Sequence, residues 1–520
     1  MTTEQAPPGA GRKEWTALAV LALPTLVLSI DMSVLNLALP YMSEDLGTDS
    51  VEQLWSIDIY GFMVAGFLIT MGTLGDRIGR RKLLLIGAAC FAVASVLAAF
   101  SSSPAMLIAS RAVMGIAGAT LAPSTLALIL NMFHRNPKQL GTAIGLWTGC
   151  FFGGLVLGPI VGGAMLHFFW WGSVFLVAVP VMVLLLVVGP ILLPEFKSPD
   201  GGRLDLFSVA LSLAAILPVI YGIKELAKDG WEVVPIVTVV VGLAFGVLFV
   251  IRQRRLASPL MDLRLFGNRS FSAALLINLV GAVIGGGTVL VINLYLQMVA
   301  GLTPLEAGLW TVPSGLAMVA TATSAPAIAR RMRPAYVIAC GLSVAAAGYV
   351  LLVFLDSVGG LAVAIIGVII TSAGSGPQAA LTTNLVLANT PPEKAGSAAS
   401  LSETCGQLGL ALGAAIMGSV ATAVYDGQLS DGVPAEAHES IVSAVAVLGG
   451  MPGEQSTQLL NNAREAFTSG VNIVAGISAV LLIGLAILGS SLLRHVPATS
   501  SGAPTQEPAD DGEGAVHTVG

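Results

Sequence analysis

The sequence predicts an all-helical protein that crosses a membrane many times. The chain of 520 residues is 55% hydrophobic and 10% charged, with a mean hydropathy of +0.86, whereas soluble domains carry about 25% charged residues. Apolar runs of roughly 20 residues recur along the whole length, enough to cross ~30 Å of hydrocarbon as a helix. Because a bilayer offers backbone groups no water, such runs must be helices, and the alternation typical of a membrane barrel is absent.

Fourteen apolar runs are bounded by polar turns, and each is expected to span the bilayer. The expected spans are 15–40, 53–73, 82–101, 105–131, 140–166, 171–193, 206–223, 233–251, 271–297, 305–329, 335–355, 359–387, 396–424 and 470–493. The first is too long for a signal-peptide core, so we expect it to be retained.

The basic residues test this count. With a cytoplasmic N-terminus, 20 of the 24 Lys and Arg residues fall on the cytoplasmic side, and only Lys224, Lys228 and Arg464 fall on the other. A wrong span count would scramble this asymmetry, so we expect both termini in the cytoplasm and a multi-pass protein of the inner (plasma) membrane. The external segment 425–468 has short helical periodicity and can be a linker or a lid over the outer opening.

Four charged residues stand out inside the expected spans, away from the span ends: Asp31, Asp58, Arg111 and Glu403. Each costs roughly 2.5–3.5 kcal/mol on insertion scales, so such residues usually face an interior cavity. Arg111 can neutralise one aspartate structurally, or it can act in transport. Three acids face this one base, so at least two lack a cation. Such carboxylates can exchange protons near neutral pH and attract a cationic guest.

Trp55 and Tyr60 flank Asp58 in the second span. An aromatic face beside a carboxylate suits a lipophilic cation through cation–π attraction. For Trp55, close to the end of the span, anchoring at the membrane interface is the favoured interpretation. For Tyr60 the two interpretations remain open.

Between the second and third spans the chain reads GTLGDRIGRRKLL, residues 72–84. Gly72 and Gly79 allow a tight turn, and Asp76 can cap a helix or pair with a base such as Arg77 or Arg80. The arrangement G-x-x-x-D-R-x-G-R is more specific than a basic loop requires.

The fifth span contains GLVLGPIVGGAM, residues 154–165. Gly154, Gly158 and Gly162 stand four apart around Pro159. Small residues at this spacing let helix backbones approach closely, and proline introduces a kink. Close packing alone explains the pattern, but a kinked, bare face is also what two bundles need to rock against each other.

Together these motifs resemble the fourteen-span drug:proton antiporter family of the major facilitator superfamily. Members of this family export many different drugs and quaternary ammonium compounds. Residues 72–82 match its loop motif, and LIASRAVMGIAGA (107–119) its fourth-span motif with an embedded arginine. GLVLGPIVGG resembles the antiporter motif, and IDMSVLNLALP the first-span motif. The resemblance covers residues 15–495.

The resemblance implies two six-helix bundles, at 15–193 and 271–493. Two linker helices and an amphipathic cytoplasmic connection fill 194–270. Residues 1–14 form a cytoplasmic tail, and 494–520 a disordered one.

The family places proton-coupling or substrate-contacting groups at Asp31, Asp58 and Arg111, and an acidic residue at the position of Glu403. Asp76 and Arg80 match loop charges that stabilise the outward-facing state, so the resemblance implies a role in conformational gating for this loop. Two departures stand out: Met114 replaces a polar residue, and the equivalent loop ARRMRPAY (329–336) lacks the glycine and aspartate.

An enzyme is disfavoured, because no catalytic, phosphate-binding or metal-ligand spacing is found and no cofactor is implied. The leading hypothesis is proton-driven export of hydrophobic, often cationic drugs, dyes and biocides by a monomer in the lipid bilayer, with no nucleic-acid partner. A dedicated exporter of one endogenous metabolite, siderophore or lipid would have the same motifs. A non-transporting membrane sensor is the third alternative, but a sensor would not need the loop, arginine and antiporter motifs.

Overall fold

The computed structural model describes most of the chain. The described residues are 11–48, 50–197, 205–229, 233–256, 259–391, 394–429, 434, 437–438, 440–449 and 454–496. Most of the two expected tails, and parts of the connections at 194–270 and 425–468, lie outside them. All regular elements in the described part are helices.

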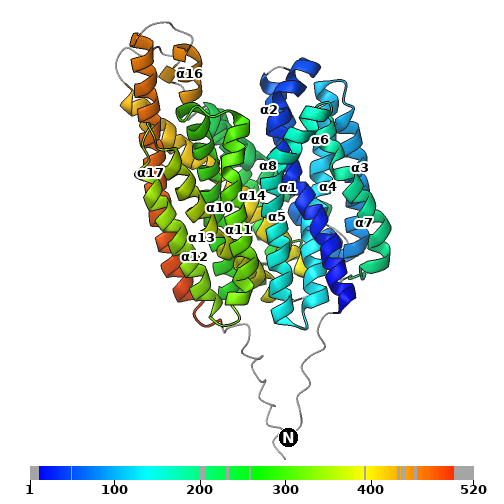
Figure 1. Cartoon of the computed structure of the whole chain (residues 1–520). Helices are drawn as coiled ribbons and strands as arrows, with labels where there is room; N and C mark the ends of the chain where they lie inside the picture. Colours follow the sequence, from blue (N-terminus) through cyan, green and yellow to red (C-terminus); the bar gives the residue numbers. More distant parts are fainter. Residues whose placement is uncertain are drawn as a thin grey trace, which may run out of the picture.

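The helices form two groups, each with its own hydrophobic core (Figure 1). The first half holds α1 (Arg12–Leu46), α2 (Ser50–Ile78), α3 (Arg80–Ala99), α4 (Pro104–Phe133), α5 (Pro137–Phe168), α6 (Ser173–Leu176) and α7 (Ala178–Leu192). The second half holds α10 (Arg269–Leu294), the π-helix η2 (Tyr295–Val299), α11 (Pro304–Ile328), α12 (Pro334–Leu352), α13 (Leu361–Ala388), α14 (Ala395–Gln428), α16 (Ile441–Gly449) and α17 (Glu454–Leu492). Between them in sequence lie α8 (Leu206–Asp229), α9 (Val233–Arg255) and the 3₁₀ helix η1 (Leu263–Gly267).

Polar caps explain where several helices begin. The Asn136 side chain accepts from the backbone of Lys138 and Gln139, and Pro137 occupies the first position of α5. Thr303 and Glu306 form a capping box at the start of α11. These pairings satisfy backbone N–H groups that have no partner within the first helical turn.

Thirteen helices in the described part are long and apolar enough to cross a membrane. The remaining expected span, 305–329, is α11, which packs along α5 and α13. Its threonine, serine and proline residues make it less apolar than its neighbours. The expected sixth span is interrupted near its start, so that α6 and α7 follow each other.

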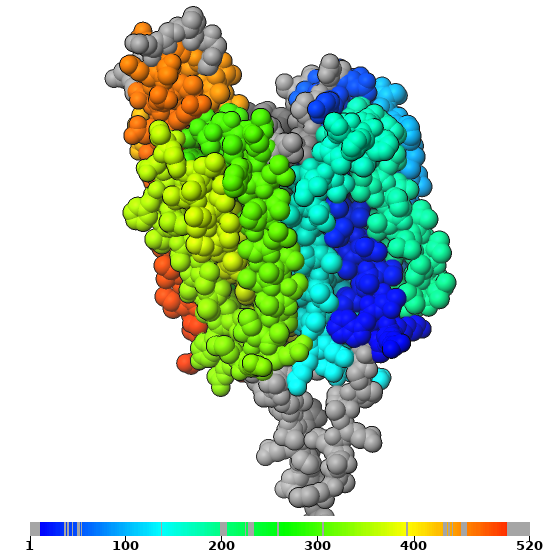
Figure 2. All heavy atoms as spheres, viewed as in Figure 1, coloured from blue at the N-terminus to red at the C-terminus, as the bar shows by residue number. Residues whose placement is uncertain are grey.

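The two halves meet along two seams, α5 against α11 and α2 against α14. Helix α8 packs on both α2 and α14, so this inserted helix covers the second seam, and α9 packs on α8. Figure 2 shows α5 and α11 in direct contact, while at the top of the view the coloured surfaces of the two halves stand apart.

One end of the molecule, called here the basic end, is where α1 begins, α3 begins at Arg80 and α11 ends before Arg330 (bottom of Figure 1). Here the halves are joined by polar contacts: Arg330 Nη2 donates to the carbonyl of Lys138 (3.1 Å) and to the hydroxyl of Thr142. Leu387, Ala395 and Ala399 of the second half pack into the core of the first. The basic end is therefore closed.

At the opposite end, α17 begins at Glu454, well before the expected span at 470, and α16 packs beside this extension (Figure 1). The Tyr425 hydroxyl donates to the carbonyl of Ala437 (2.8 Å), and Arg464 Nε donates to the carbonyl of Met298 in η2 (3.1 Å). The helical periodicity expected in 425–468 thus corresponds to α16 and the first turns of α17.

Candidate functional site

A buried ion pair joins α1 to α4. Arg111 Nη1 lies 2.7 Å from Asp31 Oδ2, and the side chains are 2% and 4% exposed. Arg111 Nε also donates to the carbonyl of Ser56 on α2 (3.3 Å). The sequence left open which aspartate pairs with Arg111, and the structure places Asp31 there.

Tyr60 lies against the same guanidinium. Its ring centroid is 4.5 Å from Arg111 Cζ, and the Phe175 ring lies 5.8 Å away. Gly115 of α4 makes this approach possible, because a Cβ at that position would lie 2.5 Å from the Tyr60 carbonyl oxygen. Two aromatic rings and one carboxylate thus surround a buried cation.

Asp58 is half-buried on α2, two residues before Tyr60. Trp55, one turn away, stacks on Tyr221 of α8 with centroids 6.3 Å apart and also lies near Phe62. Trp55 thus contacts an inserted helix while it stays 37% exposed; its anchoring at the membrane interface stays a prediction.

Glu403 of α14 lines a cavity between the two halves. The other lining residues are Thr25, Leu28, Met32, Tyr60, Val64, Leu68, Gly118, Ala122, Trp147, Phe151 and Gln407. Gln407 Nε2 donates to Glu403 Oε1 (3.1 Å). The structure therefore brings Glu403 and Tyr60 to one space, with the Asp31–Arg111 pair behind the Tyr60 ring.

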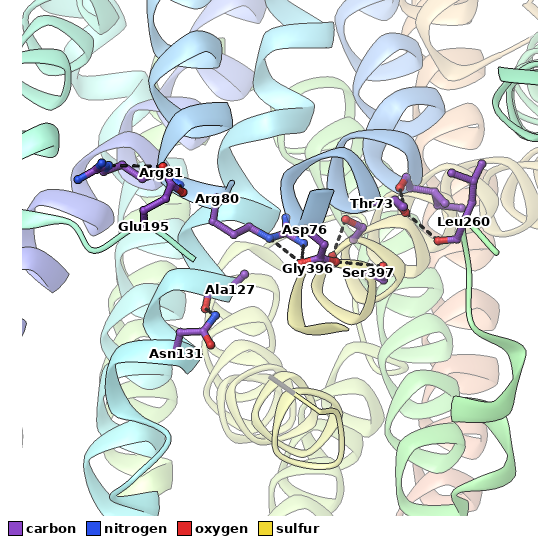
Figure 3. Close-up of polar contacts among 12 residues, drawn as sticks. Thr73, Asp76, Arg80, Arg81, Ala127, Asn131, Glu195, Leu260, Gly396 and Ser397 are labelled. Carbon is purple, nitrogen blue, oxygen red and sulfur yellow. Dashed lines mark hydrogen bonds and ion pairs between the residues drawn. The ribbon is translucent and has the colours of Figure 1, made fainter. Parts of the chain in front are cut away.

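The loop motif closes the basic end (Figure 3). Arg80 is 1% exposed, and its Nε donates to Asp76 Oδ1 (2.9 Å) in an ion pair. Asp76 Oδ2 accepts from the Ser397 hydroxyl (3.3 Å) at the start of α14. A carboxylate is favourable at a helix N-terminus, so Asp76 ties the first half to the second electrostatically.

At two positions of the motif a side chain would not fit, for a different steric reason at each. A Cβ on Gly72 would lie 2.7 Å from the Ser400 Cβ and 2.8 Å from the Gly396 carbonyl oxygen, so only glycine lets α2 and α14 meet here. Gly79 has φ +114°, which disfavours a side chain, and a Cβ there would lie 2.6 Å from Glu195 Oε1. Arg77 is half-buried at the end of α2.

Glu195 was not predicted as part of this network. Its carboxylate accepts from the backbone N–H groups of Arg81 (3.0 Å) and Lys82 (3.2 Å), and it lies 3.6 Å from the Arg81 guanidinium. Glu195 therefore caps α3 from a segment more than a hundred residues away in sequence. Because α3 begins with Arg80, this cap helps to position the Arg80 side chain beside Asp76.

Glu195→Ala is expected to lower the melting temperature, since removing an N-terminal cap costs about 1 kcal/mol. Glu195→Gln keeps one acceptor oxygen and should lose less. Thermal unfolding of the purified protein in detergent measures both. Equal melting temperatures for wild type and Glu195→Ala would show that α3 does not depend on this cap.

A second link at the basic end comes from the segment before α10. The Thr73 hydroxyl donates to the carbonyl of Leu260 (2.7 Å; Figure 3), and Asp262 forms an ion pair with Lys394. Burial opposes ionisation of Asp262, but hydrogen bonds from Lys394 and from the Arg264 backbone hold the pKa of its carboxyl below the usual range. This segment thus fastens α2 and the start of α14 from the side.

The hypothesis of two rocking bundles requires the glycines of α5 to face the second half, and two of them do not. A Cβ on Gly154 would lie 2.7 Å from the Ser29 Cβ, and one on Gly158 would lie 3.0 Å from the Ser33 Cβ. Both glycines therefore pack against α1 within the first half, and the interpretation as a face between bundles is wrong for these two.

Pro159 does face the second half, because a Cβ on Gly308 of α11 would lie 3.4 Å from its Cβ. Gly162 is buried on α5. The small residues that meet α11 are nearer the start of α5: a Cβ on Gly145 would lie 2.9 Å from Pro326 Cγ, and one on Gly149 would lie 2.6 Å from Thr323 Cγ2.

Comparisons with known proteins agree with this architecture. The model of the Major Facilitator Superfamily matches residues 21–414. The chain is 40% identical over 492 residues to the multidrug efflux pump LfrA of Mycolicibacterium smegmatis, covering 93% of this chain and 97% of that protein. It is 31% identical to the methyl viologen resistance protein SmvA of Salmonella typhimurium, covering 91% and 97%.

A solved structure, that of the human organic anion transporter MFSD10, is similar in fold, with a TM-score of 0.58 and 15% identity over 92% of this chain and 99% of that one. The matched family and the apolar helices make this a multi-pass membrane protein. The chain belongs to the major facilitator superfamily.

Proposed function

We propose that the protein is a proton-coupled antiporter that exports hydrophobic, often cationic compounds across the plasma membrane by alternating access. It acts as a monomer with its basic end in the cytoplasm, where positive charge is retained. The similarity to an efflux pump and to a viologen resistance protein supports export of drugs and biocides.

The observation that carries the proposal is the environment of Glu403. Asp31 is neutralised by Arg111, whereas Glu403 lines the cavity between the halves beside Tyr60, Trp147 and Phe151. A carboxylate among aromatic rings suits a lipophilic cation, and the position between the halves is where alternating access requires the substrate.

A proton and a cationic substrate then compete for one carboxylate. Charged Glu403 attracts the cation from the cytoplasm, and protonation from the other side removes that attraction and releases it. No phosphate-binding motif is present in the sequence, so the energy comes from the ion gradient, about 2.3 kcal/mol per charge and 100 mV.

The closed basic end corresponds to the state that cannot take up substrate from the cytoplasm. Opening it requires Asp76 to leave Ser397 and Arg330 to leave Lys138 and Thr142. These polar contacts can break and form again in each cycle, and the packing of Leu387, Ala395 and Ala399 against the first half must open with them.

Ethidium efflux from energised cells that express the protein tests the proposal. Efflux should be faster than in control cells and should stop when an uncoupler collapses the proton gradient. Unchanged efflux after the collapse would contradict proton coupling. No efflux from correctly inserted protein would contradict export of cationic drugs and favour a narrower substrate.

A further inference from the structure

The cavity at Glu403 is too small for a drug in this conformation. The centre of a water molecule can reach about 30 Å³ of it. One water needs roughly 10–15 Å³ on this measure, whereas pockets for drug-sized ligands have about 300–1,000 Å³. The space therefore accommodates one or two water molecules.

The cavity lining is mostly apolar, but Thr25, Tyr60, Glu403 and Gln407 bring polar side-chain groups to it. The Thr25 hydroxyl is buried and has no hydrogen-bond partner among the described residues. The Tyr60 side chain is 4% exposed and lines the same cavity. With the carboxylate of Glu403 and the amide of Gln407, these groups offer a water the roughly three hydrogen bonds that buried waters typically make.

Tyr60 reaches both parts of the site. Its ring lies on the Arg111 guanidinium. Its hydroxyl points toward Gly118, which lies on α4 about two turns from Arg111 toward the basic end. A Cβ on Gly118 would lie 3.1 Å from this hydroxyl, and Gly118 itself lines the cavity. Tyr60 thus connects the Asp31–Arg111 pair with the space in front of Glu403.

We propose that Thr25 and Tyr60 hold water against Glu403, and that this water site serves proton exchange when the basic end is closed. The inference rests on the proposed function. On release, the O–H bond of the Glu403 carboxyl breaks, its electron pair stays on the carboxylate, and the water accepts the proton as hydronium. On loading, the same step runs backwards.

The two hydroxyls are positioning residues, because they fix the water without taking the proton. They also donate, directly or through the water, to charged Glu403 and so stabilise its ionised form. Substrate entry widens the cavity and displaces the water, so that proton exchange and substrate binding alternate at one carboxylate.

The test uses Thr25→Val and Tyr60→Phe, each of which removes one hydroxyl with little change in volume. Purified wild type and variants are reconstituted into liposomes, and ethidium transport driven by an imposed pH gradient is recorded across a series of pH values. Both variants should shift the midpoint of the pH dependence upward by about half a unit or more, because the charged carboxylate loses stabilising hydrogen bonds.

Thr70→Val is the matched control. Thr70 is also buried with an unpartnered hydroxyl, but it does not line the cavity, so its pH profile should match the wild type. Size-exclusion profiles establish that each variant is folded, and the two variants on different helices guard against a folding defect in one.

The outcomes separate the two levels of the proposal. Wild-type transport that ignores the pH gradient would overturn both the proposed function and the water site. Gradient-driven wild-type transport with unshifted midpoints in Thr25→Val and Tyr60→Phe would overturn the water site alone. A shift in Thr70→Val as large as in the cavity variants would also overturn it, because location would then not matter.

Discussion

Asp31→Asn is expected to abolish efflux and to lower the stability of the folded protein. The change leaves the Arg111 guanidinium, which is 2% exposed, without its carboxylate. Removing one member of a buried ion pair costs about 3–5 kcal/mol, because the other charge remains desolvated and unpaired. Ethidium efflux from energised cells and thermal unfolding of the purified variant measure the two effects.

The double variant Asp31→Asn/Arg111→Gln separates structure from transport. It replaces the ion pair by two neutral amides that can bond each other, so no uncompensated charge stays buried. We expect the melting temperature to recover and efflux to stay lost. Normal efflux by the double variant would mean that the pair only holds α1 and α4 together.

The sequence singles out the residues of this candidate site where the signal is local. A charge in an apolar run is costly wherever the helix packs, so Asp31, Arg111 and Glu403 could be selected from their sequence context alone. Their pairing could not, because Asp31 and Asp58 are equally isolated in sequence. Only the packing of α1 against α4 decides which one reaches Arg111.

Contacts made over long sequence distances were missed for the same reason. Glu195 follows an apolar span and Asp262 lies in a connection, so both look like ordinary loop charges. Gly154 and Gly158 show another limit of sequence analysis. Their spacing predicted a helix face without side chains, but it could not predict which helix packs against that face. A helix has several neighbours, and the choice among them is tertiary.

Gly72→Ala is expected to prevent closure of the basic end and to slow efflux about tenfold or more. The added Cβ would meet the Ser400 Cβ at 2.7 Å and the Gly396 carbonyl oxygen at 2.8 Å, and neither atom belongs to the end of a flexible side chain. The overlap exists only while α2 and α14 are in contact, so the variant penalises one state of the cycle. A difference of about 5.5 kcal/mol would reverse a 99:1 population.

Spin labels at Arg135 and Arg331, exposed in the two halves at the basic end, measure this shift when the four native cysteines are replaced. Gly72→Ala should populate longer label separations than the wild type.

Gly61→Ala is the control on the same helix, because a Cβ there meets nothing within 4 Å. Alanine in place of a helical glycine is otherwise favourable by roughly 0.5–1 kcal/mol. If Gly72→Ala kept the wild-type separations and lost efflux, the glycine would be needed for something other than closure. Retained efflux with longer separations would mean that a tight seal between α2 and α14 is not required for transport, and the loop motif would then lose its role as a gate.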